Sequence, residues 1–461
     1  MYFLRTIQIM LNSFLKSRVG NYTSEELKKF SFLGFIFILT IAVYWFLRTG
    51  KDGVFNTIVG FKMQPVAKFA SMFFTFPLTI FYGYLVDKFP KHRVFYALAA
   101  IYSAGCFIFS LLLAHETIGI ANTIADNWRI LGWAYYLFVE SFGSIMVVLF
   151  WTYASDITSP EAGKRWFPFL SFMAQFGQLF GSAINAGYFG TFMLKSTLLI
   201  CSVAILSIAG MMYLFQTVVP ADQLRSYNDG VKEAKKEKVG QLESLKLIIS
   251  QPYLLGVFLS ITIFEVINTL FDFKFKDLIA DNIALQGFTG IAAGEMKTQM
   301  MNQWVGNMGV YAAILAIISY LLGLGNIGRK LGLTASLITL PIILVLVSLI
   351  MGVSNSLWIA FGAVVIAKAI NYVLYQPSKE QLYIPVSKDA KYKSKVLVDT
   401  MGSRFSKSVG SGVNLIKAYS PAIFPFISLF SCLGLCGFWI MISIYLGKKY
   451  NEAVSKNTVV C

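Results

Sequence analysis

The most informative residues of this chain are charged side chains inside long hydrophobic segments. Arg48 and Lys51 end one apolar run, Glu140 lies more than one turn inside another, and Arg404 and Lys407 share a segment rich in glycine and serine. An ionisable group within a membrane is costly unless it faces a protein-lined cavity or a partner. Lysine is a compact point charge and arginine a two-pronged donor, and both suit phosphate groups. These residues therefore predict a polyanion site.

A second group of charges lies later in the chain. Asp272 and Lys276 stand at the end of an apolar segment, Glu265 lies within that segment, and Lys368 lies deep in another. An unpaired carboxylate in such a place is expected to be protonated or paired with a cation. For the two cations near the end of the first apolar run, extension of the side chains to the membrane surface is a simpler alternative.

Composition limits the classes of protein that can use these charges. The 461 residues are 56% hydrophobic, above the roughly 45–50% of a soluble globule, which indicates a polytopic membrane protein. With 2 histidines and 5 scattered cysteines, we expect no metal site, no cofactor and no disulfide framework. No nucleophile and base constellation or glycine-rich phosphate loop supports an enzyme. The formal charge of +16 sits mainly in short connections, so no nucleic-acid partner is expected.

Hydrophobic runs long enough to cross a bilayer predict an all-α fold. A spanning helix needs about 20 mostly apolar residues. About 12 such runs occur, at 30–47, 66–86, 94–114, 129–155, 167–189, 195–217, 253–271, 303–325, 333–352, 356–375, 396–416 and 422–447. The run at 396–416 carries two cations and an aspartate, so it is expected to line an aqueous pathway. The alternative is a cytoplasmic amphipathic helix, which leaves one span fewer.

The longest connection divides the predicted helices into two equal sets. We expect six-helix halves at 30–217 and 253–447, joined by a charged linker at 218–252. Residues 1–29 are interpreted as an interfacial amphipathic segment and residues 448–461 as a tail. Lysine and arginine favour the connections on the side of the two termini, so the positive-inside rule places both termini in the cytoplasm. We expect insertion into a bacterial inner membrane.

The two halves share a weak internal similarity. The pairs Lys51-Asp52 and Lys276-Asp277 each come just past the first predicted helix of a half. Equivalent positions in two halves imply a parallel repeat, with substrate bound between the halves near the midplane. A cavity with more cations than carboxylates suits a polyanion and resists closing when empty, because uncompensated charge is costly in a low dielectric. Obligate exchange of substrates follows as a hypothesis.

Two connections carry candidate gating residues. The segment 83–93 places Asp87 and Arg93 in a glycine, aspartate and basic pattern that resembles the signature of the major facilitator superfamily. The charged connection before the eleventh predicted helix contains Lys379 and Glu380. We expect these four residues to act in conformational change.

Four sequence elements in order resemble the nucleotide transporter family, the ATP/ADP translocases of plastids and obligate intracellular bacteria. They are Arg48 through Asp52, Glu140 with Gly143 and Ser144, Lys379 through Pro385, and Asp399 through Ser408. The resemblance covers nearly the whole chain and implies a major-facilitator-like fold. It also implies functional roles for Lys51, Glu140 and Lys407, and for Asp272 at a position where the family usually has glutamate, with Lys276 retained nearby.

The activity implied by the resemblance is antiport that brings ATP into an intracellular bacterium in exchange for ADP. Nucleotides and the lipid bilayer are then the partners, and a monomer is the expected working unit. Lys51, Arg404 and Lys407 are expected to contact phosphates, while Glu140 and Asp272 orient these cations or act in the empty state.

Departures from the family pattern leave other readings open. Thr49 replaces an acidic residue, Asn371 falls where lysine is common, and Gln376 falls where aspartate is common. The main alternative is proton-coupled import of several nucleotides or NAD, with Glu140 as the titrating group. A nucleotide sensor that transports nothing is a further alternative.

Overall fold

The computed structural model describes residues 16, 20–190, 193–224, 241–289, 292–323, 332–371, 375–383, 385–386, 402–456, 458 and 460. Every regular element in these ranges is a helix. Nine of the helices described are long and apolar enough to cross a membrane. The prediction of an all-α, polytopic membrane protein is confirmed.

Each predicted span overlaps one long helix of the described chain. These helices are α2 (Ser24–Ile58), α3 (Gln64–Lys88), α4 (Lys91–Leu113), α5 (Ile130–Asp156), α6 (Pro160–Ala186), α7 (Leu194–Val218), α10 (Pro252–Leu285), α11 (Ala293–Leu322), α13 (Leu333–Val353), α14 (Leu357–Ile370), α17 (Ser403–Tyr419) and α18 (Phe424–Lys456). Shorter elements are η1 (Phe61–Met63), α8 (Ala221–Leu224), α9 (Gln241–Ser250) and α15 (Gln376–Gln381). Most of the predicted N-terminal amphipathic segment and the middle of the linker lie outside the described residues.

Local sequence explains where several helices start and stop. Thr23 Oγ1 accepts a hydrogen bond from the Glu26 N–H at 3.1 Å, and the two residues form a reciprocal capping box that starts α2. At the start of α6, Ser159 Oγ accepts a hydrogen bond from the Ala162 N–H at 3.3 Å, and Pro160 occupies the first turn, where a missing N–H costs nothing. The same helix ends at Gly187, whose φ of 85° favours glycine.

Two helices extend farther than the hydrophobic pattern predicts. α2 continues to Ile58 and α10 to Leu285, so the pairs Lys51-Asp52 and Lys276-Asp277 lie inside helices. The prediction that these pairs come just past the first helix of each half is wrong. The reason is that the charges are paired with one another and with neighbouring helices, so they do not need bulk water. The last helix likewise runs to Lys456, beyond the predicted limit of the second half.

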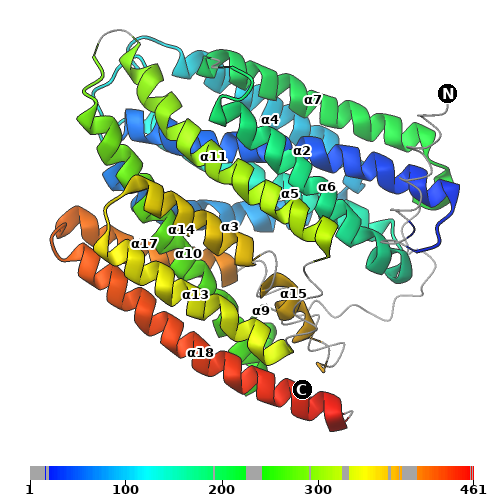
Figure 1. The fold of residues 1–461 in the computed structure, drawn as a ribbon. Coiled ribbons are helices and arrows are strands. Elements are labelled where there is room, and N and C mark those ends of the chain that lie inside the picture. The colour runs from blue at the N-terminus through cyan, green and yellow to red at the C-terminus, as the bar shows by residue number, and fades with distance from the viewer. Residues whose placement is uncertain are drawn as a thin grey trace, which may run out of the picture.

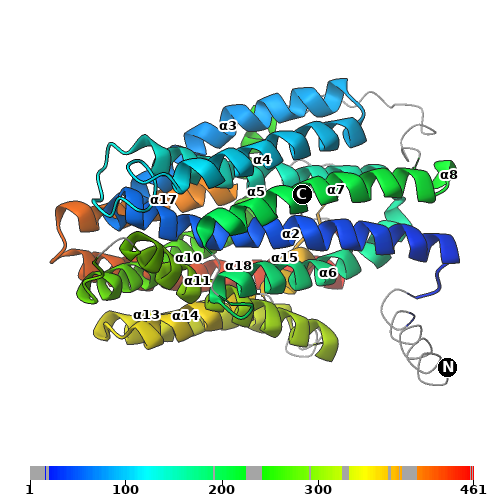
Figure 2. The ribbon, with the colours of Figure 1, turned by 90° about the horizontal axis from the view of Figure 1, so that it is seen from above.

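Buried apolar side chains form two clusters rather than one core. One cluster comes from residues 30–219, and the other comes from Phe61 together with residues 248–446. α11 nevertheless packs along α2 and α6, and α17 packs against α3. Helices of the two predicted halves therefore lie side by side (Figures 1 and 2). α17 also packs on α10 and α18 within the bundle, which favours a membrane span over a surface helix. The exact domain limits stay a prediction.

Glycines permit the closest of these helix contacts. A Cβ on Gly181 of α6 would meet the backbone of Ala42 in α2, and a Cβ on Gly306 of α11 would meet the backbone of Ser182 and Ala186 in α6. Small residues of this kind let membrane helices approach until their backbones touch. α6 therefore holds α2 on one side and α11 on the other, near the end of the bundle where α6 stops.

The two sets of helices are not equally close along their length. In Figure 1 they lie nearest each other at the end away from both chain termini, and they spread toward the end where the termini lie. We call these the distal end and the terminal end. α9 and α15 lie at the terminal end, between the spreading helices (Figure 1).

Candidate functional site

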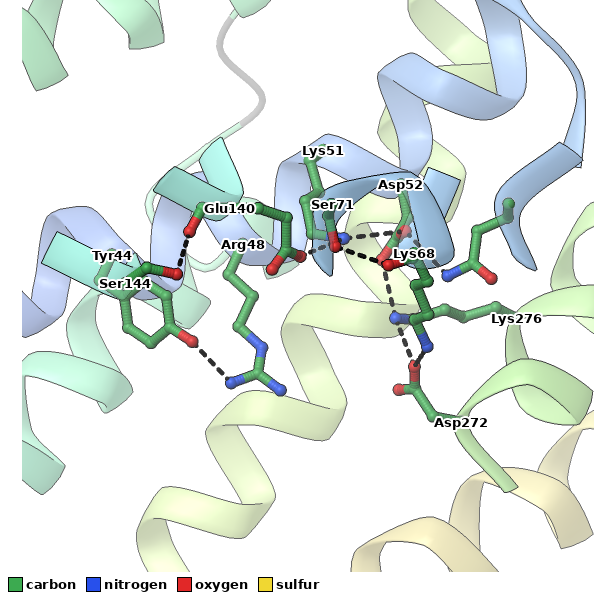
Figure 3. Close-up of polar contacts among 11 residues, drawn as sticks. Tyr44, Arg48, Lys51, Asp52, Lys68, Ser71, Glu140, Ser144, Asp272 and Lys276 are labelled. Carbon is green, nitrogen blue, oxygen red and sulfur yellow. Dashed lines mark hydrogen bonds and ion pairs between the residues drawn. The ribbon is translucent and has the colours of Figure 1, made fainter. Parts of the chain in front are cut away.

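Five charged side chains form a network toward the distal end, drawn in Figure 3. Asp52 lies 3.3 Å from Lys51 and 2.7 Å from Lys276. Asp272 lies 2.8 Å from Lys276 and 3.1 Å from Lys68. We call these five residues the ion-pair cluster. Its three lysines and two aspartates alternate, so that each carboxylate is shared by two ammonium groups.

The ion-pair cluster joins the two sets of helices. The Lys276–Asp52 pair connects α10 with α2, and the Lys68–Asp272 pair connects α3 with α10. The side chain of Asp52 is 1% exposed and that of Lys68, the most accessible of the five, is 16% exposed. Breaking a buried ion pair by removing one partner costs about 3–5 kcal/mol, because the remaining charge is left in a low dielectric. The pairs between α10 and the helices α2 and α3 must separate before the distal end can open, and loss of any one partner leaves a buried charge there.

Neutral contacts reinforce this closure. Thr57 of α2 and Thr298 of α11 share a hydrogen bond of 2.8 Å between their hydroxyls, both buried. The Lys51 ammonium also lies 3.8 Å from the centre of the Tyr136 ring, a cation–π contact that further holds the lysine in place. Lys51 is thus packed and paired in this conformation rather than free to contact a ligand.

Glu140 links the ion-pair cluster to a more accessible set of charges. Its carboxylate lies 3.3 Å from Lys51, yet its side chain is 35% exposed. One turn from Lys51 on α2, Arg48 donates to the Tyr44 hydroxyl at 2.9 Å and lies 4.9 Å from the Trp45 ring (Figure 3 draws the first contact). Arg48 is half-buried, so its guanidinium stands between packed aromatic rings and the accessible side of the network.

Lys407 completes the accessible set from the other side of the bundle. It lies on α17, its side chain is 46% exposed, and its one ion pair among the described residues is a 4.0 Å contact with Glu265 of α10. Glu140 is subject to the charges of Lys51, Lys407 and Arg48 together. We call Arg48, Glu140, Glu265 and Lys407 the open-side charges. Lys51 is thus paired with Glu140, and the charge of Lys407 acts on the same carboxylate, so the two lysines do not lie on opposite outer surfaces.

The remaining predicted residues are placed as follows. Arg404 lies in α17 and Asp87 in α3, but their side chains are outside the described part. Arg93 is exposed on α4, and its neighbour Lys91 forms a 2.6 Å ion pair with Asp156 at the end of α5. Lys379 and Glu380 lie in α15, away from the ion-pair cluster at the terminal end. Their gating role stays a prediction.

Sequence reasoning missed two members of the ion-pair cluster as site residues. The sequence places Asp52 in a repeated Lys-Asp pair and at the end of a family element but predicts no site role for it, and it does not single out Lys68. Lys68 stands near the start of a predicted span, where a lysine normally extends to the membrane surface. Nothing in the pattern indicates that it turns inward to Asp272 instead. In the part of the chain that the structure describes, no group of three or more potential ligands is placed to hold a metal ion.

A bundle of membrane-spanning helices with buried charges between its two sets defines a membrane transporter of major-facilitator-like fold. Solved structures agree on the fold: a bacterial homologue of the iron transporter ferroportin in an inward-facing state aligns with a TM-score of 0.63 and 12% identity, covering 90% of this chain and 99% of that one. The nucleoside transporter NupG aligns with a TM-score of 0.58 and 10% identity, over 93% and 100% of the two chains.

The family follows from the sequence comparisons. The family described as TLC ATP/ADP transporter matches residues 15–355 and 347–450, and this chain belongs to that family. The ADP,ATP carrier protein 4 of Rickettsia bellii is 26% identical, over 93% of this chain and 92% of the relative. The ADP,ATP carrier protein 1 of Chlamydia muridarum is 24% identical, over 95% and 92%. The predicted family, and the prediction of a nucleotide transporter rather than an enzyme, are confirmed.

Proposed function

We propose that this protein exchanges ATP for ADP across a bacterial inner membrane by alternating access, as a monomer with both termini in the cytoplasm. The supporting observation is the contrast between two neighbouring sets of charges. The ion-pair cluster is largely buried and links the two sets of helices at the distal end, whereas the open-side charges Glu140 and Lys407 next to it are accessible. Because a charged side chain is costly against lipid, this accessible surface is an aqueous one.

Phosphate groups fit the open-side charges. Arg48 and Lys407 approach from α2 and α17, and each has donors that a phosphate oxygen can accept. A phosphate chain there also attracts Lys51, whose ammonium is held by Glu140 and Asp52. Substrate and Glu140 thus compete for the same lysine. Binding weakens one member of the ion-pair cluster, which lowers the cost of opening the distal end.

The same charges supply a reason for exchange. Glu140 balances the third lysine of the ion-pair cluster, but the cluster and the open-side charges together hold five cations and four carboxylates. This excess positive charge is neutralised when a nucleotide is bound. The loaded protein can rearrange through a low-dielectric state that the empty protein reaches only at higher free energy. A carrier with this property moves one nucleotide in only when another moves out.

A specific observation also supports proton coupling as a second candidate. Glu140 is the accessible carboxylate that touches the ion-pair cluster, and protonating it would release Lys51 without any nucleotide. Import of several nucleotides, or of NAD, driven by protons would use the same fold.

Counter-transport in cells tests the proposed function. Cells that express the protein are loaded with labelled ATP and then given unlabelled ADP, GTP, UTP or NAD outside. We expect rapid loss of label with ADP and little with the other compounds. Label that leaves equally fast without any external nucleotide would contradict exchange, and a chase that works best with NAD would reassign the substrate.

A further inference from the structure

A buried lysine in α14 stands apart from the paired lysines of the ion-pair cluster. Lys368 is 9% exposed, and within the described ranges it forms no ion pair and no hydrogen bond through its ammonium. α14 packs on α10, α11 and α13, so the side chain of Lys368 lies among helices. A buried cation without a carboxylate of its own is costly.

One turn farther along, just past the last residue of α14, the chain carries a second unsatisfied group. Asn371 is 7% exposed, and its Oδ1 atom is buried without a hydrogen-bond partner. Its backbone N–H donates to the carbonyl oxygens of Ala367 and Lys368. Buried polar atoms are nearly always satisfied in native proteins, so exceptions call for a functional explanation. Positions i and i+3 of a helix are neighbours, so the two unsatisfied groups lie close together.

The carboxylates around Lys368 are already engaged elsewhere. Among the described charged groups that act on it are Arg48, Asp272, Lys276 and Glu265. Asp272 already pairs with two lysines of the ion-pair cluster, and Glu265 faces Lys407 at 4.0 Å. Arg48 repels the ammonium. Among the described side chains, the positive charge of Lys368 therefore has no carboxylate of its own.

We infer that Lys368 is the residue that makes transport by this protein an obligate exchange. Its charge is compensated only when an anion occupies the space beside the open-side charges, so the empty protein carries a buried net charge that opposes rearrangement. This inference rests on the proposed exchange of nucleotides and names the residue responsible for its coupling.

Net uptake by reconstituted protein tests the inference. Labelled ATP is added outside proteoliposomes that contain either ADP or no nucleotide. We expect wild-type protein to take up ATP only against internal ADP. Lys368→Gln should exchange at a rate within a few-fold of the wild type. It should raise uptake into empty vesicles by about 100-fold, the rate factor that corresponds to the cost of placing a lysine in the centre of a membrane.

A second variant compensates the charge of Lys368 without removing the lysine. Asn371→Asp preserves the shape of the side chain and supplies a fixed negative charge one turn from Lys368. It should also raise uptake into empty vesicles. Lys368→Arg keeps the charge and should stay strictly dependent on internal ADP. Lys274→Gln is a matched control, because Lys274 is a half-buried lysine on α10 that donates to the Met351 carbonyl, outside both sets of charges.

Each outcome decides between the two proposals. If wild-type vesicles show no dependence on internal nucleotide, the proposed exchange itself is wrong. If the wild type is an obligate exchanger and Asn371→Asp and folded Lys368→Gln remain so, the assignment to Lys368 is overturned. Folded Lys368→Gln that transports in neither mode also overturns it, because the lysine would then be needed for binding. Should Lys368→Gln fail to fold, Asn371→Asp alone decides.

Discussion

The ammonium of Lys276 on α10 lies 2.7 Å from the carboxylate of Asp52 on α2, and this ion pair, like the one between Lys68 and Asp272, links the two sets of helices beside the proposed substrate region. Both side chains are almost completely buried. The bond is strong while the distal end is shut, and it must break whenever that end opens. A contact of this kind sets the relative stability of the two conformations.

Neutralising this carboxylate should open the distal end. Asp52→Asn leaves Lys51 and Lys276 facing each other with no shared anion, at a cost of about 3–5 kcal/mol to the closed conformation. A cysteine at Thr298, which bonds Thr57 across the closed end, then reports opening through its reaction with a membrane-impermeant maleimide. We expect labelling at least tenfold faster in Asp52→Asn than in its Thr298→Cys parent.

The control for this experiment is Asp281→Asn. Asp281 is also a carboxylate on α10, but it is 66% exposed and lies 3.9 Å from Lys417, outside the ion-pair cluster. Its removal should leave the labelling rate unchanged. Equal labelling of all three proteins would show that the Lys276–Asp52 pair does not hold the distal end.

Closure of the distal end should also depend on Gly306 of α11, which lies against the backbone of α6. A Cβ at position 306 would lie 2.6 Å from the Ala186 nitrogen and 2.8 Å from the Ser182 carbonyl, and backbone atoms cannot move aside. Gly306→Val should therefore destabilise the closed conformation by about 1–3 kcal/mol and reduce exchange at least tenfold, with normal amounts of protein in the membrane. Gly362→Ala, where a Cβ meets open space, should exchange like the wild type.

Among the described cations of the ion-pair cluster and the open-side charges, Lys407 is the most exposed. It is nearly half exposed and has only a 4.0 Å contact with Glu265. Lys407→Gln removes a charged contact with phosphate worth about 1.5–3 kcal/mol, so the KM for ATP should rise by about 10- to 100-fold while membrane expression is retained. Lys449→Gln, at an exposed ion pair with Glu452, should change neither value. An unaltered KM in Lys407→Gln would refute its role.

A protonophore separates the two candidate functions. In vesicles loaded with ADP, exchange should continue when the proton gradient is collapsed. Glu140→Gln should slow exchange at every pH, because Lys51 loses the 3.3 Å partner that positions it. Proton coupling gives the opposite pattern: the protonophore abolishes uptake, and Glu140→Gln makes the residual uptake independent of pH.

The sequence predicted the positions of the helices well and their ends poorly. Hydrophobic runs identify membrane spans because the bilayer core excludes charge, and each predicted span overlaps a helix of the described chain. The ends of α2 and α10 were missed because their last turns carry charges, which the pattern treats as connections. Pairing with other helices is what keeps these turns helical, and pairing is not visible in one sequence.

The candidate site was predicted in its residue types but not in its contacts. Glu140 and Lys51 were expected to act together, and they form an ion pair. Lys51 was also expected to contact phosphate, whereas here it lies within the ion-pair cluster. Lys68 was overlooked because its inward turn depends on Asp272, more than 200 residues away in the chain. Long-range partners of this kind follow from how helices pack, not from local spacing.

The length of α2 determines how deep in the membrane the ion pairs of Lys51 and Asp52 break when the distal end opens. Its 35 residues make a helix of about 52 Å, longer than a hydrocarbon layer of about 30 Å. Lys51 and Asp52 stand about 10 Å before its distal tip, which for a centred helix coincides with the boundary between acyl chains and head groups. When the two sets of helices separate at this depth, each charged side chain of the pair has hydrated head groups within one side-chain length. Thicker bilayers would bury that boundary and slow turnover.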